Sequence, residues 1–280
     1  MVYCFCINVI QITPPPRDRK GIFMLKILTI GDVVGTAAIT HLRTHLWSAR
    51  SRLAADFVIA NGENASDIHG LSHADAEALL DCGIDLLTMG NHTYGRRDLY
   101  GFLDNDPRII RPANFPPAAP GQGYTTVRIA GWRALIINVQ GQIYMEPLAD
   151  PFDTVERILA REKGDYDFAV MDVHAEATSE KLALARVFDG RIAAIFGTHT
   201  HVPTADEQIL PHGSGYITDL GMTGPVDGIL GTNADAVITK LRTHMPQRFT
   251  VADGPIRACG ALFEIDPSTG RCASVKRITF

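Results

Sequence analysis

The sequence predicts an α/β domain built from layers of strands and helices, because three kinds of segment recur along its 280 residues. Short apolar runs end in glycine or polar residues, segments with helical spacing separate several of these runs, and two further segments have the pattern of hairpins. Strand–helix alternation with hairpins mixed in is typical of a mixed sheet or of two packed sheets.

Five apolar runs are expected to form buried strands, and each leads directly into polar side chains. They are LKILTI at 25–30, DFVIA at 56–60, IDLLTM at 84–89, DFAVM at 167–171 and RIAAIF at 191–196. Two hairpins are expected, one over 123–141 with Gly131 in its turn and one over 261–280.

Three segments have the spacing of helices. The first, over 71–83, offers Ser72 as an N-cap and Gly83 as the terminating residue. Segments 151–164 and 178–190 repeat the pattern, so each is expected to connect two strands.

Composition and charge narrow the class of protein. Hydrophobic residues make up 46% and charged residues 20%, which is ordinary globular composition, and the net charge is −5. Such a chain has no broad basic field, so stable nucleic-acid binding is not expected. The five cysteines include no CxxC pair, which favours a reducing cytoplasm.

The first 23 residues differ from the rest. MVYCFCINVIQI is apolar, but it is too short to span a membrane and has no basic residues before it and no cleavage site after it. A proline-rich stretch, TPPPRDRKG, follows. We expect residues 1–23 to be a disordered extension, or the product of an upstream start codon, and residues 24–280 to form the domain.

Metal-binding side chains follow the five predicted strands. They are Asp32, then Glu63 and Asn64, then Asn91, with His92 beside it, then His174, and finally His199 and His201. Taken by itself, each of these side chains could simply be a turn residue or a helix cap. Because strand ends collect functional groups in α/β sheets, five such positions together predict a metal site. In an extended segment, His199 and His201 would point to the same side.

The chemistry of these donors suggests the kind of centre. Cysteine is not among them, which excludes a thiolate-rich structural zinc site, and mixed oxygen and nitrogen donors suit manganese, iron or zinc. There are more donors than one ion needs. Two ions sharing Glu63 would use them, and paired ions are a recurrent arrangement for phosphate ester hydrolysis.

Six motifs carry a family resemblance. TIGDVVG, NGENA, TMGNHTY, DVHAEATSEK, GTHTHVPTADE and YITDLGMTGP resemble the YmdB-like branch of the calcineurin-like metallophosphoesterases. The resemblance implies a four-layer α/β/β/α sandwich and a di-metal phosphodiesterase acting on cyclic nucleotides such as 2′,3′-cyclic AMP, with 3′,5′-cyclic AMP as a further candidate. It also implies iron or manganese, with zinc or magnesium as alternatives, and a homo-oligomer.

The chain departs from the wider superfamily at the first metal site. Most members have Asp-x-His after the first strand, whereas this chain has Asp32-Val33-Val34, and the bridging residue is Glu63 rather than Asp. The amide oxygen of Asn64 is expected to take the place of the missing histidine. Within the YmdB-like branch this pattern is the usual one.

The resemblance assigns roles to individual residues. One metal would be held by Asp32, Glu63, Asn64 and His201, and the other by Glu63, Asn91, His174 and His199. Hydroxide activated by the metals would attack phosphorus, and His92 would protonate the leaving group or else orient a ligand. Asp172 is expected to orient His174.

Other functions fit the same residues. A nucleotidase or protein phosphatase would share the metals and differ in substrate, and a metal-binding regulator would use the same side chains without turnover. Segment 221–231, GMTGPVDGILG, fits either a wall of the active site or a subunit contact.

Overall fold

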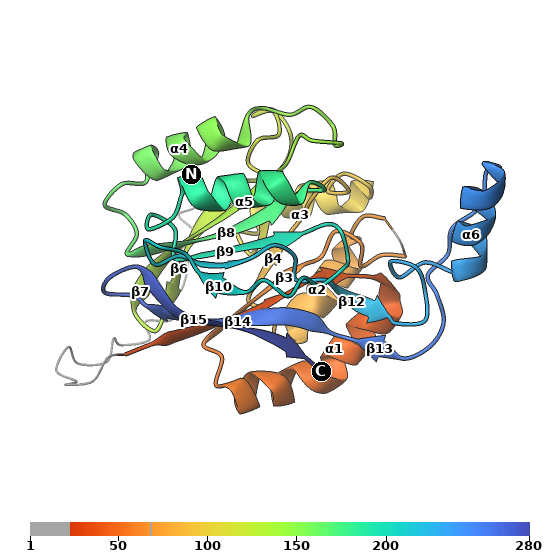
Figure 1. Ribbon diagram of the computed structural model, residues 1–280, viewed down its shortest axis with the longest axis horizontal. Coiled ribbons are helices and arrows are strands. Elements are labelled where there is room, and N and C mark those ends of the chain that lie inside the picture. The colour runs from red at the N-terminus through yellow and green to blue at the C-terminus, as the bar shows by residue number, and fades with distance from the viewer. Residues whose placement is uncertain (1–22, 68) are drawn as a thin grey trace, which may run out of the picture.

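The computed structural model, which describes residues 23–67 and 69–280, places two six-stranded sheets face to face (Figure 1). The first has the order β15 (Arg271–Thr279), β14 (Cys259–Asp266), β1 (Leu25–Ile30), β3 (Phe57–Asn61), β4 (Leu86–Thr88), β5 (Ile109–Ile110). The second has the order β10 (Gln208–Ile209), β11 (Gly215–Ile217), β9 (Ala194–Thr198), β8 (Phe168–His174), β7 (Trp132–Gln140), β6 (Tyr124–Ile129). A small sheet joins β13 (Ile256–Arg257), β12 (Met222–Pro225) and β2 (Asp32–Val33).

Helices cover the outer face of each large sheet. Those on the first sheet are α1 (Gly35–Leu53), α2 (His73–Asp81) and α3 (Tyr100–Asn105), the last preceded by the 3-10 turn η1 (Arg97–Leu99), and those on the second are α4 (Pro151–Arg161) and α5 (Thr178–Val187). One apolar cluster lies under each helical layer, and a third fills the space between the sheets. The predicted α/β/β/α sandwich is therefore confirmed.

The side chains of β1 alternate between two apolar clusters, which explains why this strand is a continuous apolar run. Leu28 and Ile30 join the cluster beneath the helices, whereas Leu25 and Ile27 join the cluster between the sheets. Successive residues of a strand point to opposite faces, so a strand buried on both faces needs apolar residues at nearly every position.

Parallel pairing brings the functional strand ends together. Strands β1, β3 and β4 run parallel in the first sheet, and β8 and β9 run parallel in the second. Their carboxyl ends therefore lie at common edges, from which the loops carrying the predicted metal-binding residues emerge.

The predicted helix caps and hairpins are confirmed. The Ser72 hydroxyl accepts a hydrogen bond from the Asp75 N–H, and α2 ends just before Gly83, which has a positive φ. The first hairpin turns through Ala130 and Gly131, both with positive φ, and β14 and β15 form the second. Helices α1, α3 and α6 (Ala234–Thr243) lie outside the three predicted helical segments.

Helix α6 differs from the other helices because it has no buried residue. It stands apart from the two sheets (Figure 1). Of the helices in the described residues, none is long and apolar enough to cross a membrane. The expectation for residues 1–23 falls, apart from Phe23, outside the described residues.

Candidate metal centre

The seven predicted ligands surround one small region at the edge of the sandwich. Their positions are set by β2 for Asp32, by the ends of β3 and β4 for Glu63, Asn64 and Asn91, and by β8 and the end of β9 for His174, His199 and His201. Ligand atoms of Glu63, His174 and His199 lie within 4.8 Å of one another, close enough to hold one ion.

The orientation of His174 follows from a buried chain of hydrogen bonds. The Thr198 hydroxyl donates to the Asp172 carboxylate over 2.8 Å, so its oxygen is free to accept from Nδ1–H of His174 at 2.9 Å. With the proton on Nδ1, Nε2 carries the lone pair, which is the form that binds metals. Asp172 thus orients His174 through Thr198 rather than by direct contact.

The lone pair of His174 faces other acceptors. Nε2 lies 3.1 Å from Glu63 Oε1 and 2.9 Å from Asn91 Oδ1, and it lies 3.1 Å from Nδ1 of His199. Oxygen and nitrogen lone pairs at these distances repel one another unless a cation lies among them. The arrangement therefore fits a bound metal ion better than a closed hydrogen-bond network.

His201 is oriented by main-chain contact. Its Nδ1 lies 3.0 Å from the carbonyl oxygen of Leu230, to which an N–H at this position donates. Nε2 then faces Asp32, whose Oδ1 is 3.8 Å away, and Asn64. Leu230 belongs to segment 221–231, so this segment forms part of the site wall, which was one of its two predicted roles.

The backbone around the two neighbouring histidines differs from the prediction. β9 ends at Thr198, and His199 and His201 have positive φ values of 98° and 65° rather than an extended conformation. The argument from alternation along a strand is therefore wrong, although both rings still reach the site. Such backbone costs about 1–3 kcal/mol per residue and persists only where surrounding contacts hold it.

Buried side chains from three other segments, α5, β2 and the loop after β11, hold this strained loop. The ammonium group of Lys181 in α5 lies 2.6 Å from Asp219 Oδ2 and donates to the Thr198 carbonyl at 2.8 Å. Asp219 Oδ2 also accepts from Thr200 N–H, and Asp32 Oδ2 accepts from His199 N–H. The sequence motifs contain Lys181 and Asp219, but no spacing rule identifies them as partners.

Burial shifts the pKa values of the side chains in the site. It raises the pKa of Asp32, which is fully buried, against the lowering effect of His201 and His174. Burial also lowers the pKa of His174 to about 4 and that of His199 to about 3, so both imidazoles are neutral near pH 7. Neutral imidazoles and carboxylates are the forms that metals bind.

Two buried oxygens add to the case for a cation. Asp32 Oδ1 and Asn64 Oδ1 accept no hydrogen bond within the described residues. Leaving a buried acceptor without a partner is costly, and a metal ion would satisfy Asp32 Oδ1 where it lies, whereas it would satisfy Asn64 Oδ1 only after the amide turns. Asn64 presents its amide nitrogen to His201, at 3.2 Å, so the amide must turn over before its oxygen can serve as the predicted ligand.

His92 lies beside this cluster. Its main-chain N–H donates to Glu63 Oε2 at 2.9 Å, and its ring lies against the His69 ring with 4.3 Å between centroids. Burial lowers the pKa of His92, and Glu63 partly opposes the effect. Glu176, to which the sequence analysis gave no role, lies 3.2 Å from Nε2 of His199 and leaves Nδ1 of that ring facing the cluster.

The sandwich and the cluster at its strand ends define a metallophosphoesterase. A family model described as YmdB-like protein matches residues 28–278, so the chain belongs to the YmdB-like family. It is 43% identical over 254 residues to a 2′,3′-cyclic-nucleotide 2′-phosphodiesterase of Bacillus subtilis, covering 91% of this chain and 96% of the relative. These matches confirm the predicted family.

Solved structures agree with the fold. A hypothetical protein from Thermus thermophilus superposes with a TM-score of 0.87 at 39% identity, over 91% of this chain and 99% of that one. A Mycoplasma pneumoniae protein described as a novel phosphatase gives 0.88 at 33% identity, over 93% and 94%. Together with the Bacillus relative, it confirms the predicted enzyme class, a phosphoesterase.

Gly90 provides a test of the His174 position. A Cβ at Gly90 would overlap the His174 ring, so Gly90→Ala is expected to displace the imidazole. Metal content should fall and kcat/KM should drop by about 100-fold, the scale expected for displacing a functional group by about 1 Å. Metal analysis and steady-state kinetics measure both effects.

Gly101→Ala is the matched control, because a Cβ there meets no described atom within 4 Å and α3 tolerates alanine. That variant should keep full metal and activity. A folded Gly90→Ala protein, judged by circular dichroism, that also kept both would contradict the proposed position of His174.

Proposed function

We propose that this protein is a di-metal phosphodiesterase that hydrolyses cyclic nucleotides, with 2′,3′-cyclic AMP as the preferred substrate and 3′,5′-cyclic AMP as a further one. The main observation in support is the short distance from Nε2 of His174, which bears a lone pair, to the oxygens of Glu63 and Asn91. The 43% identity to a 2′,3′-cyclic-nucleotide 2′-phosphodiesterase supports the choice of substrate.

Each proposed metal has its own ligands and shares Glu63. One ion would be held by Asp32, Glu63, Asn64 and His201, and the other by Glu63, Asn91, His174 and His199. The oxygen and nitrogen donors, without a thiolate, suit manganese, iron or zinc, and the family resemblance favours iron or manganese, with zinc and magnesium as alternatives.

The chain's own residues then perform distinct tasks. Bound metals would supply Lewis acidity that neutralises phosphate charge and lowers the pKa of water. Thr198 and Leu230 hold His174 and His201 in the tautomers required. His92 would give its proton to the departing 2′-oxygen of the ribose. Burial leaves His92 mostly neutral, so the phosphate charge must raise its pKa for this role.

The proposed compartment is the cytoplasm. Among the described residues, Cys82, Cys259 and Cys272 are free and buried, and burial raises the pKa of each thiol. Free thiols without disulfide partners suit a reducing environment.

A substrate panel tests the proposed function. The protein should contain two equivalents of metal and convert 2′,3′-cyclic AMP to the nucleoside 3′-phosphate, because the bond to the 2′-oxygen breaks. Faster turnover of 5′-AMP would identify a nucleotidase, and faster turnover of a phosphopeptide a protein phosphatase. Bound metal without turnover of any ester would identify a regulator.

His92→Ala distinguishes a proton donor from a ligand. The variant should keep both metals, while kcat for 2′,3′-cyclic AMP should fall by about 10²–10⁴, the range for losing a general acid. The loss should shrink for a nitrophenyl diester, because a nitrophenolate departs without a proton. Equal losses on the two substrates, with metal retained, would end the case for His92 as the acid.

We also propose that the protein is a homo-oligomer in which α6 forms part of the contact. Ile238 and Leu241 of α6 are 43% and 69% exposed, and a ten-residue helix with no buried side chain is marginal in water. Asp235 lies in its first turn, with Lys240 and Arg242 in its last. Two antiparallel copies would therefore pair opposite charges around an apolar stripe.

Light scattering after size-exclusion chromatography tests this contact. Leu241→Asp should lower the particle mass, whereas Val187→Asp, at an exposed apolar position on α5, should leave it unchanged. A wild-type monomer would refute the oligomer. An unchanged mass in Leu241→Asp would exclude α6 from the contact.

A further inference from the structure

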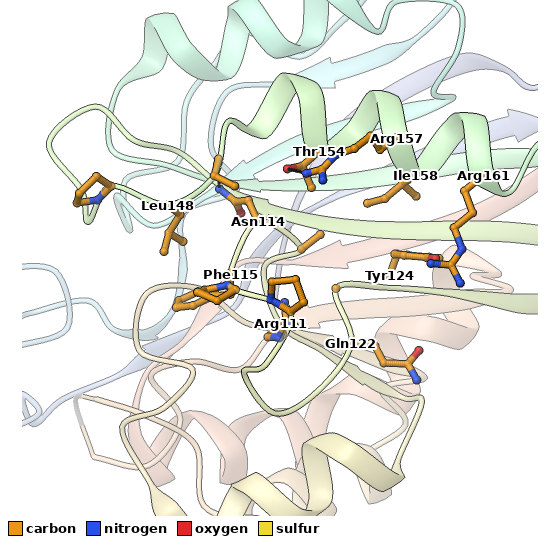
Figure 2. Close-up of a pocket in the computed structure, with 16 residues that line it drawn as sticks. Arg111, Asn114, Phe115, Gln122, Tyr124, Leu148, Thr154, Arg157, Ile158 and Arg161 are labelled. Carbon is orange, nitrogen blue, oxygen red and sulfur yellow. Dashed lines mark hydrogen bonds between the residues drawn. The ribbon is translucent and has the colours of Figure 1, made fainter.

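A cavity separate from the metal centre lies between α4 and the loop over residues 111–123 (Figure 2). Its volume is about 830 Å³, within the range that accommodates a small organic ligand. The seven proposed metal ligands are not among the described residues that line it. The cavity nevertheless adjoins the catalytic edge, because Asn114 in its wall donates to the carbonyl of Gln140, which pairs with His174 across β7 and β8.

The cavity is positively charged although the chain is acidic. Arg111, Arg157 and Arg161 line it, and the described lining residues include no Asp or Glu. The whole chain carries a net charge of −5, so three lining arginines are not explained by composition, and the nearby carboxylate of Glu162, which accepts from Tyr124, offsets only part of their charge. Such a cavity concentrates anions.

Arg111 is buried and donates to the carbonyls of Pro112, Ala119 and Pro120, whereas Arg157 and Arg161 are only partly engaged. Arg157 donates to the Asp153 carbonyl and the Thr154 hydroxyl, and within the described residues it forms no ion pair. Arg161 has its Nε 3.5 Å from Glu162 Oε1, but 78% of its side chain is exposed. Both lie on α4, four residues apart, and residues at this spacing share one helix face. Their remaining N–H groups are available to one multiply charged anion.

The opposite wall offers aromatic and apolar surface beside the polar side chains of Arg111, Asn114 and Gln122. Phe115 faces α4 across the cavity, with Leu148 at one end and Tyr124 beneath Arg161 at the other (Figure 2). Phe115 is also packed edge-on against Tyr94, with 5.3 Å between ring centroids. A flat ring held against Phe115 would lose water from apolar surface while its charged end reached the arginines.

We propose that this cavity is a second, non-catalytic binding site for a phosphorylated small molecule that carries a flat ring, the chemical class of the nucleoside monophosphates. Arg157 and Arg161 bind the phosphate, and Phe115 and Leu148 contact the ring. A phosphate is favoured over a carboxylate because two guanidinium groups on neighbouring helical turns can share its several oxygens.

Calorimetric titration of the metal-loaded protein with 5′-AMP tests the site. We expect binding with a Kd of about 1 mM or tighter that persists in His201→Ala, where the metal centre is altered. The double variant Arg157→Gln, Arg161→Gln should weaken it by about tenfold or more, while Arg128→Gln, an exposed arginine on β6 outside the cavity, should not. The affinity for 5′-AMP should fall less in Arg157→Lys than in Arg157→Gln.

Two further probes separate the parts of the ligand. Inorganic phosphate should bind about tenfold more weakly than 5′-AMP, because it has no ring to contact Phe115. Phenylacetate binding as tight as 5′-AMP binding would overturn the assignment to phosphate. The proposal would be overturned if His201→Ala did not bind 5′-AMP. It would also be overturned if the double variant bound 5′-AMP as tightly as the wild-type protein.

Discussion

The metal centre depends on two hydrogen bonds to the buried carboxylate of Asp172. These bonds join the two sheets directly beneath the centre. Thr88 on β4 of the first sheet donates to one oxygen at 2.5 Å, and Thr198 on β9 of the second donates to the other at 2.8 Å. Burial raises the pKa of Asp172 to about 7, against the effect of these hydrogen bonds. The same Thr198 hydroxyl orients His174, so sheet packing and ligand orientation share one group.

A second buried charge stabilises the other half of the site. Lys181 and Asp219 are almost fully buried, and they contact the main chain on both sides of His199. Breaking such a pair by removing one partner strands the other charge, at a cost of about 3–5 kcal/mol. This charged pair therefore helps to hold the positive φ angles of His199 and His201. It does so through the main chain, without contacting the proposed ligand atoms.

Much of the fold could be predicted from local patterns, since apolar runs, caps and glycine turns are set by neighbouring residues. The run at 25–30 became β1, the run at 191–196 became β9 with its bounds shifted to Ala194–Thr198, and Ser72 caps α2 as its position indicates. Helix α6 lies outside the predicted helical segments. Its sequence has an apolar stripe, but none of its residues is buried against the sandwich, so the position of this helix could not be predicted.

The candidate site was predictable in its residue types and less so in its geometry. Metal-binding side chains at the ends of parallel strands lie at one edge of their own sheet, and the packing of the two sheets then brings Glu63 of the first beside His174 of the second. The backbone of His199 and His201 depends on Asp32 and Asp219, distant in sequence, and local alternation carries no information about such contacts. The same holds for the link from Asp172 to His174 through Thr198.

The central claim is that two metal ions occupy one centre and share Glu63. Anomalous X-ray scattering from crystals of the metal-loaded protein, measured at the absorption edge of the metal found by elemental analysis, tests it most directly. We expect two peaks, one among Asp32, Glu63, Asn64 and His201 and one among Glu63, Asn91, His174 and His199. A single peak, or peaks away from these residues in fully loaded protein, would contradict it.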